Sequence, residues 1–157
     1  MIVAGIDPGM TGAMVILFPD NSTIVCRVPL MKKGKVQPAW SEWRDDWTDA
    51  LYDANMIVIE QVGAMPKQGS ASGFNFGRSY GFAHAIASGW SIPVHFVTPA
   101  VWKGKMGLLK ADKNASREEA RRLLPSIAPE VTRVKDDGVA EAALLAYYGR
   151  VYLCSMN

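Results

Sequence analysis

The chain has 157 residues, of which 49% are hydrophobic and 20% are charged. This length and composition predict a single domain spanning residues 1–157, with enough apolar side chains to build its own core. No apolar run approaches the roughly 20 residues that a bilayer-spanning helix needs, and the first residues lack the features of a signal peptide. The two cysteines, Cys26 and Cys154, are far apart in the sequence. We therefore expect a cytoplasmic protein with free thiols, and exclude membrane and disulfide-stabilised classes.

Charge is unevenly distributed, although the formal net charge is only +2. Residues 101–122 carry seven basic and three acidic side chains, a net +4, whereas residues 40–56 carry one basic and five acidic side chains, a net −4. A basic segment on a nearly neutral protein favours a polyanionic partner such as nucleic acid. A solvated surface without a partner explains the same cluster.

The first half of the chain predicts a three-stranded meander followed by a helix. Short β-favouring runs at residues 2–6, 13–18 and 23–28 are separated by turns rich in Gly, Pro, Asp and Asn. A polar loop with Lys32, Lys33 and Lys35 follows. Apolar residues then recur every three or four positions over residues 40–54, which predicts a helix that packs on the sheet. The residues of this stripe are Trp40, Trp43, Trp47, Leu51 and Ala54.

The second half predicts strands that alternate with helices. Residues 56–59 form a continuous apolar run that ends at Glu60, as expected for a central strand covered on both faces. The remaining predicted elements are a loop at 62–73, a helix at 74–88, a strand at 93–97, a helix beginning at Thr98-Pro99, and helices at 115–124 and 137–150. Antiparallel strands followed by strand–helix alternation predict an α/β fold with a mixed five-stranded sheet flanked by helices.

Two acidic residues lie where predicted strands end. Asp7 follows the first strand in the segment GIDPG, and Glu60 ends the fourth strand. Sites in sheets of this type gather beyond the carboxyl ends of the strands, close to a change in strand order. An acidic residue at a strand end is also common as a simple turn or cap residue, so neither residue identifies a site by itself.

A third acidic element begins the last predicted helix, in the segment KDDGVAEAALLAYYG. Asp137 and Glu141 are four residues apart, so both carboxylates project from one side of the helix. Like charges at this spacing repel, which favours a nearby cation. The alternative is that Asp136 or Asp137 caps the helix and that Glu141 is an acid of its first turns, favoured by the helix dipole.

These acids would converge if the last helix packs across the first and fourth strands. Carboxylate oxygens are the ligands that Mg²⁺ prefers, and two such ions about 3.5 to 4 Å apart can activate a water and stabilise the leaving oxygen of a phosphodiester. A ligand shared by both ions is expected on a rigid central strand. Asp7 is the candidate for that position.

The segments GIDPGMTGAMV, IVIEQV and KDDGVAEAALLAYYG, in this order, resemble those of the RuvC family of Holliday junction resolvases. The likeness spans nearly the whole chain, is strongest to short bacteriophage and prophage members, and extends to FNFGRSYG and TPAVWK. It implies a ribonuclease-H-like fold and a homodimer. It also implies an endodeoxyribonuclease that nicks four-way DNA junctions symmetrically with two Mg²⁺ ions per active site, for which Mn²⁺ can substitute, and with no nucleotide cofactor.

The resemblance assigns roles to individual residues. Asp7 would bridge the metal ions, Glu60 would hold one ion, and Asp137 with Glu141 would hold the other. Lys103 and Lys113 would assist at the scissile phosphate, as lysines of the family's basic loop do, with Lys110 as their neighbour. The residues expected to contact DNA are Lys67, Arg78, Lys103, Lys105, Lys110, Lys113 and Arg117.

The sequence departs from the family pattern at two positions. Bacterial members commonly carry His where this chain has Gly138, so the metal ligand of the first turn is Asp137 or Asp136. We favour Asp137 because Asp136 lies about 140° around the helix from Glu141. Gly63 replaces a family aromatic that probes the junction. Phe74 and Phe76 either substitute for it as stacking residues or serve as core or dimer contacts.

Other functions fit parts of the sequence. GIDPGMTG partly matches the phosphate loop of actin-like ATPases and sugar kinases, but those folds need two such domains to enclose a nucleotide. An RNA-processing nuclease of the same fold is an alternative within the nucleases. A junction-binding protein without catalysis, in which the acids are structural, is a third alternative.

Overall fold

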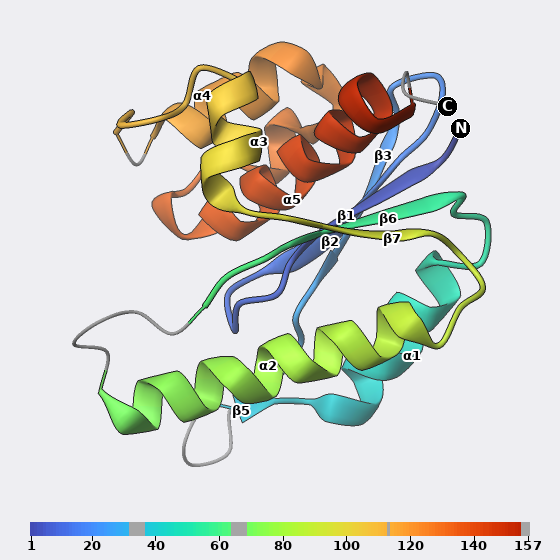
Figure 1. Cartoon of the computed structure of the whole chain (residues 1–157), viewed down its shortest axis with the longest axis vertical. Helices are drawn as coiled ribbons and strands as arrows, with labels where there is room; N and C mark the ends of the chain where they lie inside the picture. The colour runs from blue at the N-terminus through green and yellow to red at the C-terminus, as the bar shows by residue number, and fades with distance from the viewer. Residues whose placement is uncertain (32–36, 64–68, 113, 155–157) are drawn as a thin grey trace.

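The computed structural model describes residues 1–31, 37–63, 69–112 and 114–154. Its centre is a mixed five-stranded sheet with strand order β3-β2-β1-β6-β7. β1 pairs antiparallel with β2, and β2 with β3, whereas β6 runs parallel to both β1 and β7. The strands are β1 (Val3–Asp7), β2 (Ala13–Leu17), β3 (Thr23–Arg27), β6 (Met56–Glu60) and β7 (Val94–Val97). The predicted meander and mixed sheet are confirmed (Figure 1).

A short two-stranded ribbon, β4 (Leu30–Met31) with β5 (Gln37–Pro38), follows the meander. The sequence predicted only a polar loop here. Its three lysines lie outside the described residues, as does the segment 64–68 of the predicted loop at 62–73.

Helices cover both faces of the sheet (Figure 1). On one face lie α1 (Trp40–Ala50) and α2 (Ser70–Ser88). On the other lie α3 (Pro99–Lys105), α4 (Ala115–Leu123) and α5 (Asp137–Tyr148). Short turns complete this second layer: the 3-10 turns η1 (Pro125–Glu130) and η2 (Val134–Asp136), and the π-helical turn η3 (Gly149–Leu153) after α5. Among the described helices, none has the length and apolar character needed to cross a bilayer.

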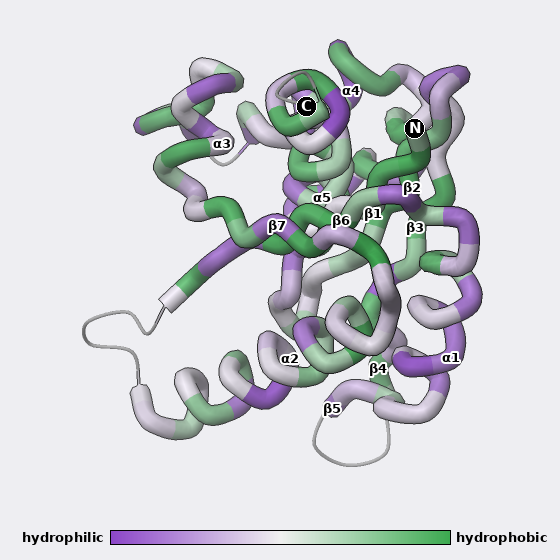
Figure 2. Tube along the Cα trace, turned by 45° about the vertical axis from the view of Figure 1, so that its right-hand side comes forward, coloured by the Kyte–Doolittle hydropathy of each residue, from purple (hydrophilic) through white to green (hydrophobic). Residues whose placement is uncertain are grey.

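The predicted tryptophan stripe packs on the sheet. Trp43 and Trp47 of α1 are fully buried in the same apolar cluster as Ile6 of β1 and Ile57 of β6. The central strands β1 and β6 are largely apolar up to their last residues, Asp7 and Glu60 (Figure 2). The stripe therefore belongs to the core between the sheet and the α1/α2 layer.

Alternation along β1 and β6 decides which face carries the acids. Val3 and Val58 pack in the cluster on the α5 side, whereas Ile6 and Ile59 pack in the cluster on the α1/α2 side. Because successive side chains of a strand point to opposite faces, Asp7 at the end of β1 shares the face of Val3. By the same alternation, Glu60 at the end of β6 shares the face of Val58. Both strand-end acids therefore belong to the face covered by α5.

Several element boundaries differ from the sequence prediction. The helix predicted over residues 40–54 ends at Ala50. α2 begins at Ser70, one turn before the predicted start, with Gly69 as its N-cap residue. Ser and Gly are favoured at helix N-termini as well as in loops, so composition alone did not separate the two. The last helix was predicted to reach residue 150, but its α-helical part ends at Tyr148 and continues as a π-helical turn.

Close contact between β1 and α5 depends on Gly5. A Cβ atom at this position would overlap the backbone of Ala142 and Ala146 in α5. We expect Gly5→Ala to lower the free energy of unfolding by about 3 kcal/mol, because backbone atoms of a packed helix cannot yield as a flexible side chain does. Urea unfolding followed by circular dichroism measures the change.

Gly81→Ala is the matched control. A Cβ atom at Gly81, in exposed α2, would meet nothing within 4 Å. Since Ala is favoured over Gly inside a helix, this variant should be up to about 1 kcal/mol more stable than wild type. Equal stability of the two variants would contradict the tight β1–α5 contact.

Candidate active site

Three acidic side chains from distant parts of the sequence interact at one edge of the sheet. Asp7 and Glu60 end the adjacent parallel strands β1 and β6, and Glu141 lies one turn into α5. Burial raises the pKa of Asp7 to about 6, with the charge of Glu141 acting in the same direction. Burial also raises the pKa of Glu60 to about 7, and the charges of Glu141 and Asp7 add to the effect. The three carboxylates therefore repel one another in a partly dry environment, which a bound cation would relieve.

A tight turn orients Asp7. Its Oδ1 accepts the backbone N–H of Gly9 at 3.0 Å, and the N–H of Gly12 donates to the carbonyl of Gly9 at 2.9 Å. Turn chemistry thus occupies only Oδ1, and Oδ2 faces the N-terminus of α5. Gly138 lies there, and a Cβ atom at this position would be 2.8 Å from Oδ2 of Asp7 and 2.9 Å from Cα of Gly12. In this packing, the position where bacterial RuvC members commonly carry His has no room for a side chain.

Glu60 is oriented from the other side by Trp102. The Glu60 side chain is buried and accepts a hydrogen bond from the indole Nε1–H of Trp102 at 3.0 Å. Trp102 is fully buried in α3, in the apolar cluster under α5. Trp102 belongs to the segment TPAVWK, but no role for this residue follows from the sequence. Its only signal was its position next to Lys103 in a predicted helix.

Each of the two α5 acids is paired with a basic side chain from a neighbouring helix. Glu141 Oε1 accepts from Lys103 Nζ at 2.7 Å and from the Ser116 hydroxyl at 3.3 Å. Asp137 Oδ1 lies 2.9 Å from Arg117 Nε. A hollow of about 320 Å³ between α5, α4 and the end of α3 is lined by four of these side chains, those of Lys103, Ser116, Asp137 and Glu141. This hollow is the accessible part of the candidate site.

Asp136 has a different environment. Its side chain is 3% exposed, and its carboxylate contacts Arg133 at 2.8 Å and Arg27 of β3 at 3.7 Å. The Arg133 guanidinium, which donates to this carboxylate, holds the pKa of Asp136 below its usual value. Asp136 thus ties η2 to the sheet, and it is Asp137 that shares the hollow with Glu141.

The described residues contain no group of three His, Cys, Asp or Glu side chains that forms a ready cation cage. The donor set nevertheless suits Mg²⁺, since all candidates are carboxylates and three of them repel one another. Two of the four candidate ligands are instead held by cations of the protein itself, Lys103 and Arg117. Binding of a divalent ion would therefore require these two acids to change partners.

The predicted DNA-contacting residues occupy different environments. Lys105 and Lys110 are exposed, whereas Arg117 is only 7% exposed and belongs to the acidic site. Arg78 of α2 lies over the Trp40 ring at 5.0 Å, within the α1/α2 layer. Lys67 and Lys113 lie outside the described residues.

The aromatic residues of α2 also differ in their burial and contacts. Phe82 is partly buried and packs against the core residue Trp43, with ring centroids 5.0 Å apart. Phe76 stacks on Tyr80 at 6.1 Å. Phe74 is 68% exposed, so it is not a core residue, and a stacking or dimer role for it stays a prediction.

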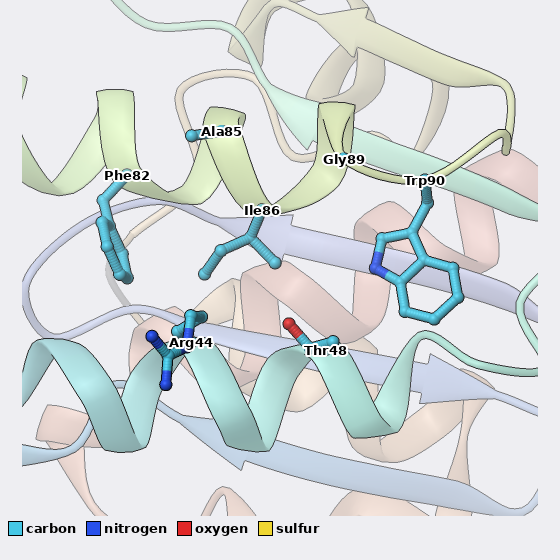
Figure 3. A pocket seen from close by; sticks show the side chains of 7 residues that line it. All are labelled: Arg44, Thr48, Phe82, Ala85, Ile86, Gly89 and Trp90. Carbon is cyan, nitrogen blue, oxygen red and sulfur yellow. The ribbon is translucent and has the colours of Figure 1, made fainter.

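A separate groove of about 450 Å³ lies between α1 and α2, on the face of the sheet opposite α5 (Figure 3). Among the described residues that line it, none is acidic and most are apolar. The lining residues are Arg44, Thr48, Phe82, Ala85, Ile86, Gly89 and Trp90. The groove therefore lacks the donors of a divalent-cation centre.

Comparison with known proteins agrees with this architecture. No protein-family model and no curated protein sequence matches the chain. Among solved structures, T. thermophilus RuvC in complex with Holliday junction substrate superposes with a TM-score of 0.69 at 18% identity, covering 100% of this chain and 97% of that chain. A second Thermus thermophilus RuvC structure superposes with a TM-score of 0.58 at 21% identity, covering 96% of each chain. The chain thus has a ribonuclease-H-like fold. More particularly, its fold is that of RuvC over the full length.

Proposed function

We propose that this protein is a Mg²⁺-dependent endonuclease that resolves four-way DNA junctions by paired symmetric nicks. The observation that carries the proposal is the meeting of Asp7, Glu60 and Glu141 at one edge of a RuvC-like sheet. Asp137 lies beside them in the hollow that Glu141 lines. A structurally similar protein, T. thermophilus RuvC, is described in complex with a Holliday junction. The sequence motifs favour short phage and prophage members of the family as its relatives. The cytoplasm is its proposed place of action.

Each candidate residue has a specific role in the proposed reaction. Asp7, Glu60, Asp137 and Glu141 would hold the divalent ions, which activate water and stabilise the leaving oxygen of a phosphodiester. Trp102 orients the carboxylate of Glu60, and the Gly9 N–H orients that of Asp7. Lys103, next to Glu141, places a positive charge where negative charge develops on the scissile phosphate. Lys105, Lys110, Lys113, Lys67 and Arg78 are proposed contacts to the DNA backbone.

We further propose that the active form is a homodimer. A four-way junction presents two equivalent strands for symmetric nicking, and one chain supplies one acidic site. Two copies related by a twofold axis place one site on each strand. Sedimentation of the protein with and without a junction measures the stoichiometry.

The proposal is tested with synthetic DNA. A four-way junction, a duplex of the same sequence and a structured RNA are labelled strand by strand and incubated with the protein at equal salt, in Mg²⁺ or in EDTA. We expect cleavage of the junction only, in Mg²⁺ only, at symmetric positions on opposed strands. Faster cleavage of RNA would replace the proposal with an RNA-processing enzyme. Tight junction binding without cleavage in Mg²⁺ or Mn²⁺ would replace it with a non-catalytic binding protein.

A further inference from the structure

Arg117 is a buried cation within the acidic site. Its sequence position in the basic segment predicted a surface contact to DNA, but its side chain is only 8% exposed. The guanidinium lies between two side chains: its Nη2 donates to Asn114 Oδ1, and its Nε is 2.9 Å from Asp137 Oδ1. Charged side chains are seldom buried unless they have a partner, so Arg117 depends on Asp137.

The contact between Arg117 and Asp137 is imperfect. The two atoms are within ion-pair distance, but neither Arg117 Nε nor Asp137 Oδ1 has a partner in hydrogen-bond geometry among the described residues. The neighbouring pair is better made, because Glu141 accepts hydrogen bonds from both Lys103 and Ser116. A buried polar atom without a hydrogen bond is unfavourable. The Arg117–Asp137 pair therefore resists rearrangement less than a well-formed buried ion pair would.

Resting on the proposed function, we propose that Arg117 is an internal counter-ion, which holds Asp137 in the metal-free protein and yields it to a divalent cation on loading. Arg117 neutralises Asp137 in a site where three other carboxylates already repel one another. Divalent ions then bind by exchange, because a ligand held by a guanidinium must be released first. This exchange accounts for a carboxylate-rich site in which the described residues form no ready cage.

The alternative role for Arg117 is positioning. If Arg117 held Asp137 in the orientation that a metal ion needs, its removal would weaken metal binding. If Arg117 competes with the metal ion for Asp137, its removal should instead strengthen metal binding. Loss of a positive charge next to a ligand strengthens that ligand's attraction for a cation. The direction of the change in affinity therefore separates the two roles.

Titration calorimetry with Mn²⁺ alone, on DNA-free protein, tests the exchange. We expect Arg117→Met to bind Mn²⁺ about threefold to tenfold more tightly than wild type, the range expected for removal of a modest ion-pair competitor. Arg117→Lys keeps the charge and should stay close to wild type. Arg122→Met is the matched control in the same helix, because Arg122 is exposed and pairs with Glu119, and its affinity should be unchanged. Equal or weaker binding by folded Arg117→Met overturns the proposal.

A second measurement uses the wild-type protein and does not depend on the folding of a variant. The side-chain Nε–H resonance of Arg117 is assigned in ¹⁵N NMR spectra by its absence in Arg117→Lys. Titration with Mg²⁺ should shift this resonance, whereas that of Arg122 should not move. An unchanged Arg117 resonance at saturating Mg²⁺ contradicts the exchange.

Failure of this inference is distinguishable from failure of the nuclease proposal. If wild type binds metal and cleaves junctions but Arg117→Met binds no more tightly, only the counter-ion role is wrong. If Arg117→Met binds more tightly and no variant cleaves any nucleic acid, the exchange stands and the nuclease assignment fails. If neither protein binds Mn²⁺, both are overturned.

Discussion

We expect Asp7→Asn to reduce the rate of junction cleavage by at least about a thousandfold while leaving a folded protein. Asp7 ends β1 beside β6, its charge acts on Glu60, and in the proposed site it is the ligand that both metal ions would share. An amide is a poor ligand for Mg²⁺ compared with a carboxylate, but its carbonyl oxygen can still accept the Gly9 N–H. Single-turnover cleavage of a labelled four-way junction measures the loss.

The same substitution should stabilise the metal-free protein at neutral pH. Burial raises the pKa of Asp7 from 3.8 to about 6, so the folded state holds this proton more tightly than the unfolded state. The stability that the folded state gains from this tighter proton binding is fully present below pH 3.8 and is lost as the pH rises to about 6. Asn carries no charge to desolvate. We expect an increase of about 1 to 2 kcal/mol in the free energy of unfolding at pH 7.5 in EDTA.

Asp49→Asn is the control for both measurements, because Asp49 is an exposed acid on α1, on the opposite face of the sheet. It should change neither cleavage nor stability. Cleavage by Asp7→Asn at the wild-type rate would remove Asp7 from the site and with it the proposed mechanism.

The second large effect is the dependence of metal-free stability on pH. The pKa values of Asp7 and Glu60 are raised to about 6 and about 7. Both groups lose stabilising protons as the pH rises through these values. We expect them together to lower the free energy of unfolding by about 2 to 4 kcal/mol between pH 4 and pH 8, which corresponds to a fall in Tm of about 5 to 10 °C. Thermal unfolding in EDTA across this range measures the effect.

Two comparisons show whether Asp7 and Glu60 cause the pH dependence of the metal-free stability. Asp136, Asp20 and Glu119 have lowered pKa values, so their contributions to stability are gained as the pH rises from the acid range. The double variant Asp7→Asn/Glu60→Gln should lack the loss of stability that Asp7 and Glu60 cause as the pH rises. The contribution of the site is therefore the difference in stability between wild type and this double variant at each pH. Mg²⁺ at pH 8 should restore the Tm of wild type but not that of the double variant. A wild-type protein that gains stability up to pH 8 in EDTA relative to the double variant contradicts the raised pKa values.

Local patterns predicted most of the fold. The meander, the buried strand that ends at Glu60 and the helices at α1, α3, α4 and α5 follow from spacing of apolar residues and from Pro and Gly at their ends. Element ends were less certain, as for α2, because Ser and Gly suit both a loop and a helix N-terminus. The ribbon of β4 and β5 was missed because two-residue strands carry no periodicity.

The candidate site was predicted in part. Strand ends and a helix start can be located from the chain itself, which singled out Asp7, Glu60, Asp137 and Glu141, and the resemblance joined these four acids into one candidate site. The roles of Trp102, Arg117 and Gly138 were not identifiable, because each depends on a residue far away in sequence. Trp102 bonds Glu60 across 42 residues, and Gly138 is in close contact with the turn after β1.

The sequence by itself determined a mixed α/β fold and the carboxylate composition of its candidate site, since alternation, helical period and the placement of acids are local properties. Only the tertiary structure decided the state of those acids. Packing of α3 and α4 against α5 puts Lys103 on Glu141 and Arg117 on Asp137. The packing of the helices decides which charged side chains become neighbours, and this packing cannot be derived from the spacing of residues along the chain.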